Sequence, residues 1–297
     1  MNVPTISPRA GIGLKPQHYT QALQSVSASR PANAAPGWLE VHPQNYFCAG
    51  GPPHRWLEVI SEHFALSFHS VGLSLGSAGG CFRDELEQLA TLCDRYAPAL
   101  VSDHLSWSGS ASNRVPDLLP VPYTGAALAH FCGQIACVQD RLRRTILIEN
   151  PSRYLAFAHD EMDEVSFLHD VCRTTGCRIL LDINNIEVSA TNLGFDPYDY
   201  LGRIDHRLVE EVHLAGHSVE NHASGPLLID DHGSPVSELT WDLFAAFCRA
   251  SGPKPVLVEW DTDVPAFETL LSEAHKADSI IAHETGVSEV ARDRAFA

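Results

Sequence analysis

Eight short apolar segments, most of which end in a metal-binding side chain, constrain the fold of this chain more than any other feature. Each has the length and composition of a buried strand. They span Gly11–Leu14, Trp38–His42, Leu66–Val71, Ala99–His104, Thr145–Pro151, Arg178–Asn185, Leu208–His217 and Pro255–Asp261. Helical patterns separate most of them, and a strand–helix unit repeated about eight times predicts parallel strands with the helices outside. We therefore predict an α/β fold, a (β/α)8 TIM barrel.

The segments between these strands differ in how clearly they resemble helices. Strong helical patterns cover Phe82–Arg95, Thr124–Arg144, Glu161–Thr175 and Leu239–Arg249, and weaker ones cover Gln17–Ala28, Pro53–His63, Asp196–Ile204 and Val264–Lys276. Two connections, Ser106–Thr124 and His217–Glu238, are long and contain several glycines and prolines. A doubly wound open sheet is the competing architecture, but the Gly-Ile-Gly near the start lacks the third glycine of a dinucleotide-binding fingerprint.

The length of 297 residues suits a single barrel domain. We expect its core to cover residues 11–280 and residues 281–297 to form a peripheral tail. The first ten residues do not resemble a secretory signal, and no apolar run is long enough for a membrane helix, so we expect a soluble cytoplasmic protein. None of the eight cysteines forms a Cys-x-x-Cys pair, which favours reduced, buried thiols over disulfides or a zinc ribbon.

The balance of charge argues against a nucleic-acid partner. With 37 acidic and 20 basic residues the formal net charge is −17, which repels a phosphate backbone and favours a basic partner or peptide. A local basic patch could still bind DNA, but the sequence contains no dense Lys/Arg cluster with interleaved aromatic residues. We predict neither nucleic-acid nor membrane binding.

Imidazole and carboxylate side chains recur at the carboxyl ends of the predicted strands. They are His69, His104, Glu149, Asp182, His213 and Glu259. In a (β/α)8 barrel these ends converge on one rim, where active sites are built. Two imidazoles and a carboxylate with open positions suit a redox-active iron or a hydrolytic zinc, and a carboxylate such as Glu149 can bridge two cations. Asn185, Asp230 and His232 would supply a third position, closed partly by a long loop.

Each candidate also has an ordinary structural interpretation. A single histidine near a strand end is more often a core or surface residue, and Asp182 could simply cap the next helix. Glu149 is harder to explain in this way, because a buried carboxylate must be paired, hydrogen-bonded or bound to metal. Six strand ends that all carry ligand types favour a metal site.

Other polar and aromatic residues fall near the same rim. His42, Asn45, Asn150, Asn184 and His217 are candidates for orienting the ligands or contacting substrate. Trp107, Tyr123 and Trp260 could form pocket walls or belong to the core. Both long connections follow strands that carry candidate ligands, so we expect them to overhang the site and shape access to it.

Several of these motifs together resemble a known family. FHSVGLSLGS, VSDHLSW, LPVPYT, ILIENPSRYL, LLDINNIEVSATNLGFDP, EVHLAGHS, LLIDDHG and VLVEWDTDVP are similar to segments of the multinuclear non-haem iron-dependent oxidative enzymes. That family includes the methanobactin-biosynthesis oxidase and the thiaglutamate-pathway enzyme that excises a cysteine β-carbon. The resemblance extends from about Gly11 to Ala277.

The resemblance implies a xylose isomerase-like barrel with a ligand layout similar to that of endonuclease IV. His69, His104 and Glu149 would hold one iron. The second would be held by Glu149, acting as a bridge, with Asp182, His213 and Glu259. The third would use Asn185, Asp230 and His232, and it would be held less tightly because Asn185 is a neutral amide. We assign catalytic roles to Glu149 and to His217, the latter as a proton carrier.

The resemblance also implies two or three ions as mixed Fe(II)/Fe(III), dioxygen as co-substrate, and a ribosomally made, cysteine-containing precursor peptide as substrate. A separate partner protein would bind the leader of that peptide. Two other classes remain open on the residues alone: a zinc-dependent hydrolase of the endonuclease IV type, and a non-catalytic metal-homeostasis protein. The acidic charge and Asn185 argue against the hydrolase, and open coordination positions argue for catalysis.

Overall fold

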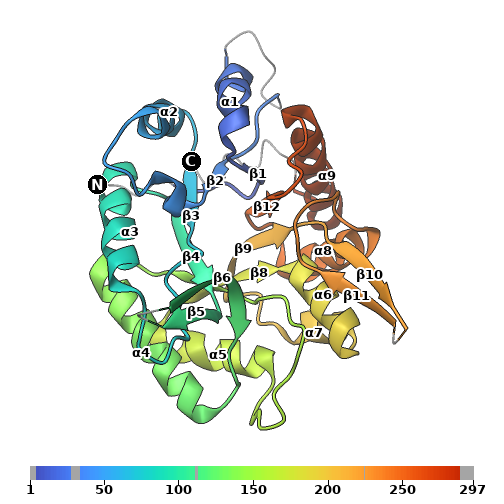
Figure 1. Cartoon of the computed structure of the whole chain (residues 1–297). Coiled ribbons are helices and arrows are strands. Elements are labelled where there is room, and N and C mark those ends of the chain that lie inside the picture. The colour runs from blue at the N-terminus through green and yellow to red at the C-terminus, as the bar shows by residue number, and fades with distance from the viewer. Residues whose placement is uncertain (1–4, 28–33, 111–112, 224, 288–297) are drawn as a thin grey trace.

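The computed structural model describes residues 5–27, 34–110, 113–223 and 225–287, and within them eight parallel strands form a closed barrel (Figure 1). Their order around the barrel is β1-β12-β9-β8-β7-β4-β3-β2. The barrel strands are β1 (Ala10–Gly13), β2 (Leu39–Val41), β3 (Leu66–His69), β4 (Leu100–His104), β7 (Leu147–Glu149), β8 (Arg178–Asp182), β9 (Val209–Leu214) and β12 (Val256–Val258). Each lies within a predicted apolar segment or one residue outside it. The predicted (β/α)8 barrel is therefore confirmed.

Helices surround the barrel (Figure 1). They are α1 (Tyr19–Ser25), α2 (Pro52–Ser61), α3 (Arg83–Tyr96), α4 (Gly125–Leu142), α5 (Glu164–Thr175), α6 (Ile183–Leu193), α7 (Pro197–Arg203), α8 (Glu238–Ser251) and α9 (Phe267–Thr285). Short 3-10 turns, η1 (Pro16–His18) and η3 (Pro43–Tyr46), follow β1 and β2. The apolar faces of the strands and helices pack into one large core between the two layers.

Two helix predictions need correction. Helix α6 was not predicted, and it begins directly after β8, so the predicted strand segment Arg178–Asn185 is extended only as far as Asp182. The strand ends there because the Asp182 carboxylate accepts a hydrogen bond from the backbone N–H of Asn185 at 2.6 Å and caps the helix. At the other end of the chain, α9 continues past the predicted end at Lys276 to Thr285, and Ile281 on it is buried. Residues 288–297 of the predicted peripheral tail lie outside the described residues.

Both long connections fold into antiparallel hairpins at the carboxyl end of the barrel strands. The hairpin after β4 consists of β5 (Ser106–Ser110) and β6 (Asn113–Pro120), and the hairpin after β9 consists of β10 (Ser218–His222) and β11 (Gly225–Ile229). Long rim loops were predicted here from the sequence, but these strands were not. Figure 1 shows the first hairpin in front of the barrel and the second beside α6 and α8.

Side-chain alternation decides what fills the barrel. Successive side chains of a strand point to opposite faces, so the residue two positions before a ligand also faces inward. Ser102 precedes His104 on β4 in this way, and Glu211 precedes His213 on β9; all four side chains are buried. The barrel interior therefore contains a second polar layer beneath the candidate ligands.

Strand β1 carries a glycine where a side chain cannot fit. A Cβ atom at Gly11 would lie 2.5 Å from Cδ2 of Trp38, closer than carbon atoms approach in proteins. Trp38 is fully buried, and its indole N–H donates to the carbonyl of Arg9 at 2.9 Å, which holds the ring in place. Gly11 is thus required for Trp38 to pack against the strand.

We expect Gly11→Ala to lower the free energy of unfolding by about 1–3 kcal/mol, because the added methyl overpacks a rigid site. Chemical denaturation measures this. The matched control is Gly133→Ala in α4, where a Cβ would meet nothing within 4 Å. There the change should raise the free energy of unfolding by about 0.5–1 kcal/mol. Stabilisation by both substitutions would contradict the packing argument.

Two expectations of the sequence analysis concern membrane-spanning helices and the state of the cysteines. None of the helices in the described part of the chain is both long enough and apolar enough to span a membrane. All eight cysteines lie in that part and carry free thiols, although Cys48 and Cys137 are exposed rather than buried. The expectation that the thiols are buried holds for Cys132, Cys172, Cys177 and Cys248.

Candidate metal centre

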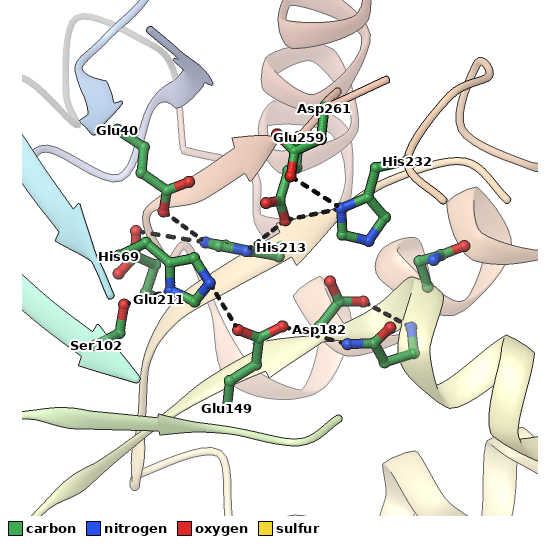
Figure 2. Close-up of polar contacts among 12 residues, drawn as sticks. Glu40, His69, Ser102, Glu149, Asp182, Glu211, His213, His232, Glu259 and Asp261 are labelled. Carbon is green, nitrogen blue, oxygen red and sulfur yellow. Dashed lines mark hydrogen bonds and ion pairs between the residues drawn. The ribbon is translucent and has the colours of Figure 1, made fainter. Parts of the chain in front are cut away.

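The strand-end residues converge inside the mouth of the barrel, as predicted from their positions (Figure 2). His69 ends β3, His104 ends β4, and Glu149 ends β7. The Nε2 atoms of the two histidines lie 3.2 and 3.1 Å from the same carboxylate oxygen, Glu149 Oε2. The Nδ1 atom of His69 forms a 2.8 Å hydrogen bond with the Ser102 hydroxyl, which turns Nε2 toward the centre. Two imidazoles and one carboxylate thus face a common point.

A second group shares Glu149. Ligand atoms of Glu149, Asp182 and His213 lie within 4.8 Å of one another, and His213 Nδ1 is 3.0 Å from Oε2 of Glu259, the residue after β12. Asp182 satisfies both interpretations of its sequence position: Oδ1 caps α6, and Oδ2 is buried without a hydrogen-bond partner among the described residues. One oxygen can therefore serve the helix while the other remains available to a cation.

The predicted third position is assembled only in part. His232 Nε2 is 2.7 Å from Asp230 Oδ1, just beyond β11, and His232 forms a group with Asp182 and Glu259 whose ligand atoms also lie within 4.8 Å. Asn185 lies nearer the first group, since its amide N–H2 donates to Glu149 Oε1 at 3.2 Å. The Asn185 carbonyl oxygen is buried and has no partner among the described residues. The structure brings Asp230 and His232 together and places Asn185 beside Glu149.

Burial sets the protonation of four candidate ligands when no cation is present, whereas neighbouring carboxylates raise the pKa of His213 and His232. Burial raises the pKa of Asp182 to about 7 and the pKa of Glu149 well above its usual range. The same loss of water lowers the pKa of His104 to about 4 and the pKa of His69 well below its ordinary value. A divalent cation requires ionised carboxylates and neutral imidazoles, so it would displace protons from the carboxylates and find these two rings already neutral.

The residues therefore fit a multinuclear metal centre. Glu149 Oε2, Asp182 Oδ2 and the Asn185 carbonyl oxygen are buried atoms without a hydrogen-bond partner in the described part of the chain. Leaving such atoms unpaired is costly, and metal cations at this centre would satisfy them. Mixed imidazole and carboxylate donors suit iron, zinc or manganese.

Three charged residues near the centre were missed by sequence reasoning. Glu40 in the middle of β2 and Glu211 on β9 are fully buried inside the barrel, and Lys15 forms an ion pair with Asp261. The signal for Glu211 was available, because it stands two residues before His213 on the same strand face. Glu40 interrupts the apolar run Leu39–Val41, and a charge in such a run marks either a functional position or an error in the strand assignment.

The other candidate residues near the rim have different environments. Asn150 joins β7 to β8 by two hydrogen bonds to the backbone of Asp182, both 2.9 Å. Tyr123 is in the core, where its hydroxyl donates to Glu164, so it is not a pocket wall. Trp107 lies on the β5–β6 hairpin and is partly exposed, which leaves it available as a wall.

His217 lies outside the ligand cluster. Its Nδ1 atom forms a 2.7 Å hydrogen bond with the side-chain oxygen of Asn184, and the amide of Asn184 donates to Asp230 at 2.9 Å. Its Nε2 atom faces Glu187 Oε1 at 3.7 Å. His217 is therefore connected to the third position through one side chain. His42 is closer to the ligands, with Nε2 3.8 Å from oxygens of both Glu40 and Glu259.

Comparison with known proteins gives one family. A family model described as "RiPP precursor modification enzyme MbnB/TglH/ChrH" matches residues 9–282. The UPF0276 protein of Caulobacter sp. (strain K31) is 46% identical over 276 residues, which cover 93% of this chain and 97% of that protein. The UPF0276 protein of Vibrio vulnificus (strain CMCP6) is 43% identical over 274 residues, covering 92% of each.

Solved structures with the same fold are more distant in sequence. An L-ribulose 3-epimerase superposes with a TM-score of 0.57 at 14% identity, covering 97% of this chain and 96% of that one. Endonuclease IV from Thermus thermophilus also has a TM-score of 0.57 at 14% identity, covering 93% and 100%. At this identity the likeness establishes the xylose isomerase-like barrel and nothing about the reaction.

Proposed function

The chain belongs to the MbnB/TglH/ChrH family of RiPP precursor modification enzymes. From this premise we propose that it is an iron-dependent oxidase that uses dioxygen to modify a cysteine, or another residue, in a ribosomally synthesised precursor peptide. The observation that carries the proposal is the convergence of buried imidazoles and carboxylates, with unpaired oxygens, at the end of the barrel where such enzymes place their sites. Family membership supports a peptide substrate, and the donor set is one that iron accepts.

We assign the ligands in three sets that share residues. His69, His104 and Glu149 would hold the first iron; Glu149, Asp182, His213 and Glu259 the second; and Asn185, Asp230 and His232 the third. Bound as a mixed Fe(II)/Fe(III) set, the metal would supply a thiolate-binding, oxygen-reducing centre. The short approach of two histidines to Glu149 Oε2, and the sharing of Glu149 between two groups, support its role as the bridge.

The surrounding side chains would orient the ligands and manage protons. The Ser102 hydroxyl fixes the ring of His69, and Asn150 fixes the backbone of Asp182. We propose that His217 carries a proton at Nε2, exchanging it with Glu187, while its Nδ1 bond to Asn184 holds it in place. Burial of the ligands excludes bulk water from the centre.

A cavity of about 520 Å³ beside the rim supports a peptide substrate. The residues that line it include Val71 and Gly72, which follow His69, and Val115 and Leu118 of the β5–β6 hairpin. Further apolar side chains are exposed on segments that follow barrel strands, among them Trp107, Tyr154, Leu155 and Val219. A leader-binding partner protein and a cytoplasmic location complete the proposal, and the net charge of −17 favours a basic leader or partner.

Metal content tests this function first. Protein purified without oxygen should contain two or three irons per chain by elemental analysis, partly ferric by Mössbauer spectroscopy. Dioxygen should be consumed only when a cysteine-containing precursor peptide is present, and a Cys→Ser peptide is the control. Full activity with zinc alone, or modification of the peptide without oxygen, would overturn the proposal and favour a hydrolase.

A further inference from the structure

Two buried carboxylates, Glu40 and Glu211, lie beside the Nε2 atom of His213, whereas Glu259 lies beside its Nδ1 atom (Figure 2). Glu40 Oε2 is 3.1 Å from His213 Nε2, and Glu211 Oε1 is 3.8 Å from the same nitrogen. All three side chains are at most 1% exposed. Nothing in the assignment of ligands above uses either carboxylate.

Their burial needs a physical reason. Both oxygens of Glu40, one oxygen of Glu211 and Nε2 of His213 lack an aligned hydrogen bond among the described residues. The other oxygen of Glu211 accepts a hydrogen bond from Ser67 at 3.2 Å, so Glu211 is tied to β3 while Glu40 is not. Glu40 is therefore a buried acceptor that lies 3.1 Å from Nε2 of His213 and 3.8 Å from Nε2 of His42, without an aligned hydrogen bond to a donor among the described residues.

The contact matters because an imidazole has two different nitrogens. A ring whose proton is held on one nitrogen presents the lone pair of the other to a metal. His69 is held at Nδ1 by Ser102 and presents Nε2 to Glu149. His213 is turned the opposite way: Nε2 faces Glu40, and Nδ1 faces Glu259 at 3.0 Å.

We propose that Glu40 is a positioning residue for the second metal ion: it accepts the Nε2 proton of His213 and so presents Nδ1 as the ligand atom. Glu211, farther from the ring and already bonded to Ser67, supports the pair without contacting the proton directly. The inference rests on the proposed metal centre, but it does not depend on which metal fills that centre or on any oxidase activity.

The test compares two substitutions of Glu40 that differ in one property. Glu40→Gln keeps a side-chain oxygen that can accept from Nε2, whereas Glu40→Leu removes the acceptor at similar size. Zinc, which is diamagnetic, is loaded into the full chain with 15N-labelled histidine, and competition with a chelating dye gives the affinity for each ion. The 15N shifts of His213 report which of its nitrogens binds the metal. Glu164→Gln is the control, because Glu164 is a buried carboxylate bonded to Tyr123 and Tyr200.

We expect wild type, Glu40→Gln and Glu164→Gln to bind zinc through Nδ1 of His213 with the same number of ions. Glu40→Leu should weaken one ion by about 10–100-fold, as losses of hydrogen-bond partners to ligands do, and should lose the Nδ1 signature. Unchanged affinity and Nδ1 coordination in Glu40→Leu would overturn the proposal. An equal loss of zinc affinity in Glu40→Gln and Glu40→Leu would also overturn it, because Glu40 would then bind the metal itself or act through its negative charge. If the zinc results hold but the iron-loaded enzyme consumes no oxygen, the positioning role stands and the proposed function fails.

Discussion

Glu149→Gln is expected to reduce the iron content to one ion or fewer per chain and to lower the rate of peptide modification by about 10³-fold or more. The amide offers one neutral oxygen in place of two charged ones, so it cannot join the His69/His104 group to the Asp182/His213 group. Loss of a metal that stabilises developing charge removes several kcal/mol from the reaction, and about 4 kcal/mol corresponds to that rate factor. Elemental analysis and a single-turnover assay on anaerobically purified protein provide the measurement.

The control variant shows whether the loss of iron is specific to the bridging carboxylate or follows from the removal of any buried carboxylate. Glu164→Gln removes a charge that is also buried, but its partners are two tyrosine hydroxyls and the guanidinium of Arg153 rather than candidate ligands. That variant should lose stability and keep its iron and its activity. Wild-type iron stoichiometry in Glu149→Gln would refute the bridging role, because a residue that joins two ions cannot be replaced without loss of at least one.

Metal removal should destabilise the protein, and the effect should depend on pH. In the metal-free protein the pKa of Asp182 is raised to about 7 from an ordinary value of 3.8, because burial disfavours the charge. A raised carboxyl pKa contributes stability that is complete below pH 3.8 and is lost as the pH rises through 7. Ferrous iron restores stability above that range, by about 4 kcal/mol when its concentration is about 1,000 times the dissociation constant. Thermal unfolding of iron-loaded and chelator-treated protein, without oxygen, should therefore differ most at pH 7.5 and least at pH 5.5.

The protons that the carboxylates carry in the metal-free protein also determine how metal affinity varies with pH. Each proton that the ion displaces weakens binding by about tenfold for every pH unit below the pKa of the group that carries it. Asp182→Asn is a suitable control, because asparagine caps a helix as well as aspartate does but does not titrate. Its affinity should be lower at pH 7.5 and should change less between pH 7.5 and 5.5. An affinity for iron that is independent of pH in the wild type would show that these carboxylates are not ligands.

The barrel was predictable because its strands leave a local signal. Strands that are buried on both faces are nearly continuous apolar runs. Each of the eight barrel strands lies within one of the apolar segments found in the sequence, or begins one residue outside it. The two hairpins were not predicted, because exposed two-stranded ribbons such as Ser218–His222 have no buried face and hence no apolar pattern. Helix α6 was missed for a related reason: its first turn, with Asn184 and Asn185, is buried but polar.

The candidate ligands were predictable for a topological reason. A parallel barrel brings every strand end to one rim, so His69, Glu149 and Glu259 become neighbours although 190 positions separate the first from the last. Residues in the middle of strands, above all Glu40, escaped because the convergence of strand ends gives them no special place. Asn185 remains the proposed partner of Asp230 and His232, and the start of α6 brings its amide N–H2 within 3.2 Å of Glu149 Oε1.

Sequence alone therefore determined the fold class, the rim at which chemistry is expected and most of the side chains that gather there, because apolar runs and strand ends are local features. Only the tertiary structure decided which atoms face one another. One oxygen of Asp182 caps a helix while the other faces the centre, His69 and His213 are turned in opposite directions, and Glu40 lies beside Nε2 of His213. Those choices depend on contacts between strands that are distant along the chain, and a one-dimensional pattern does not contain the rotation of a side chain about its own bonds.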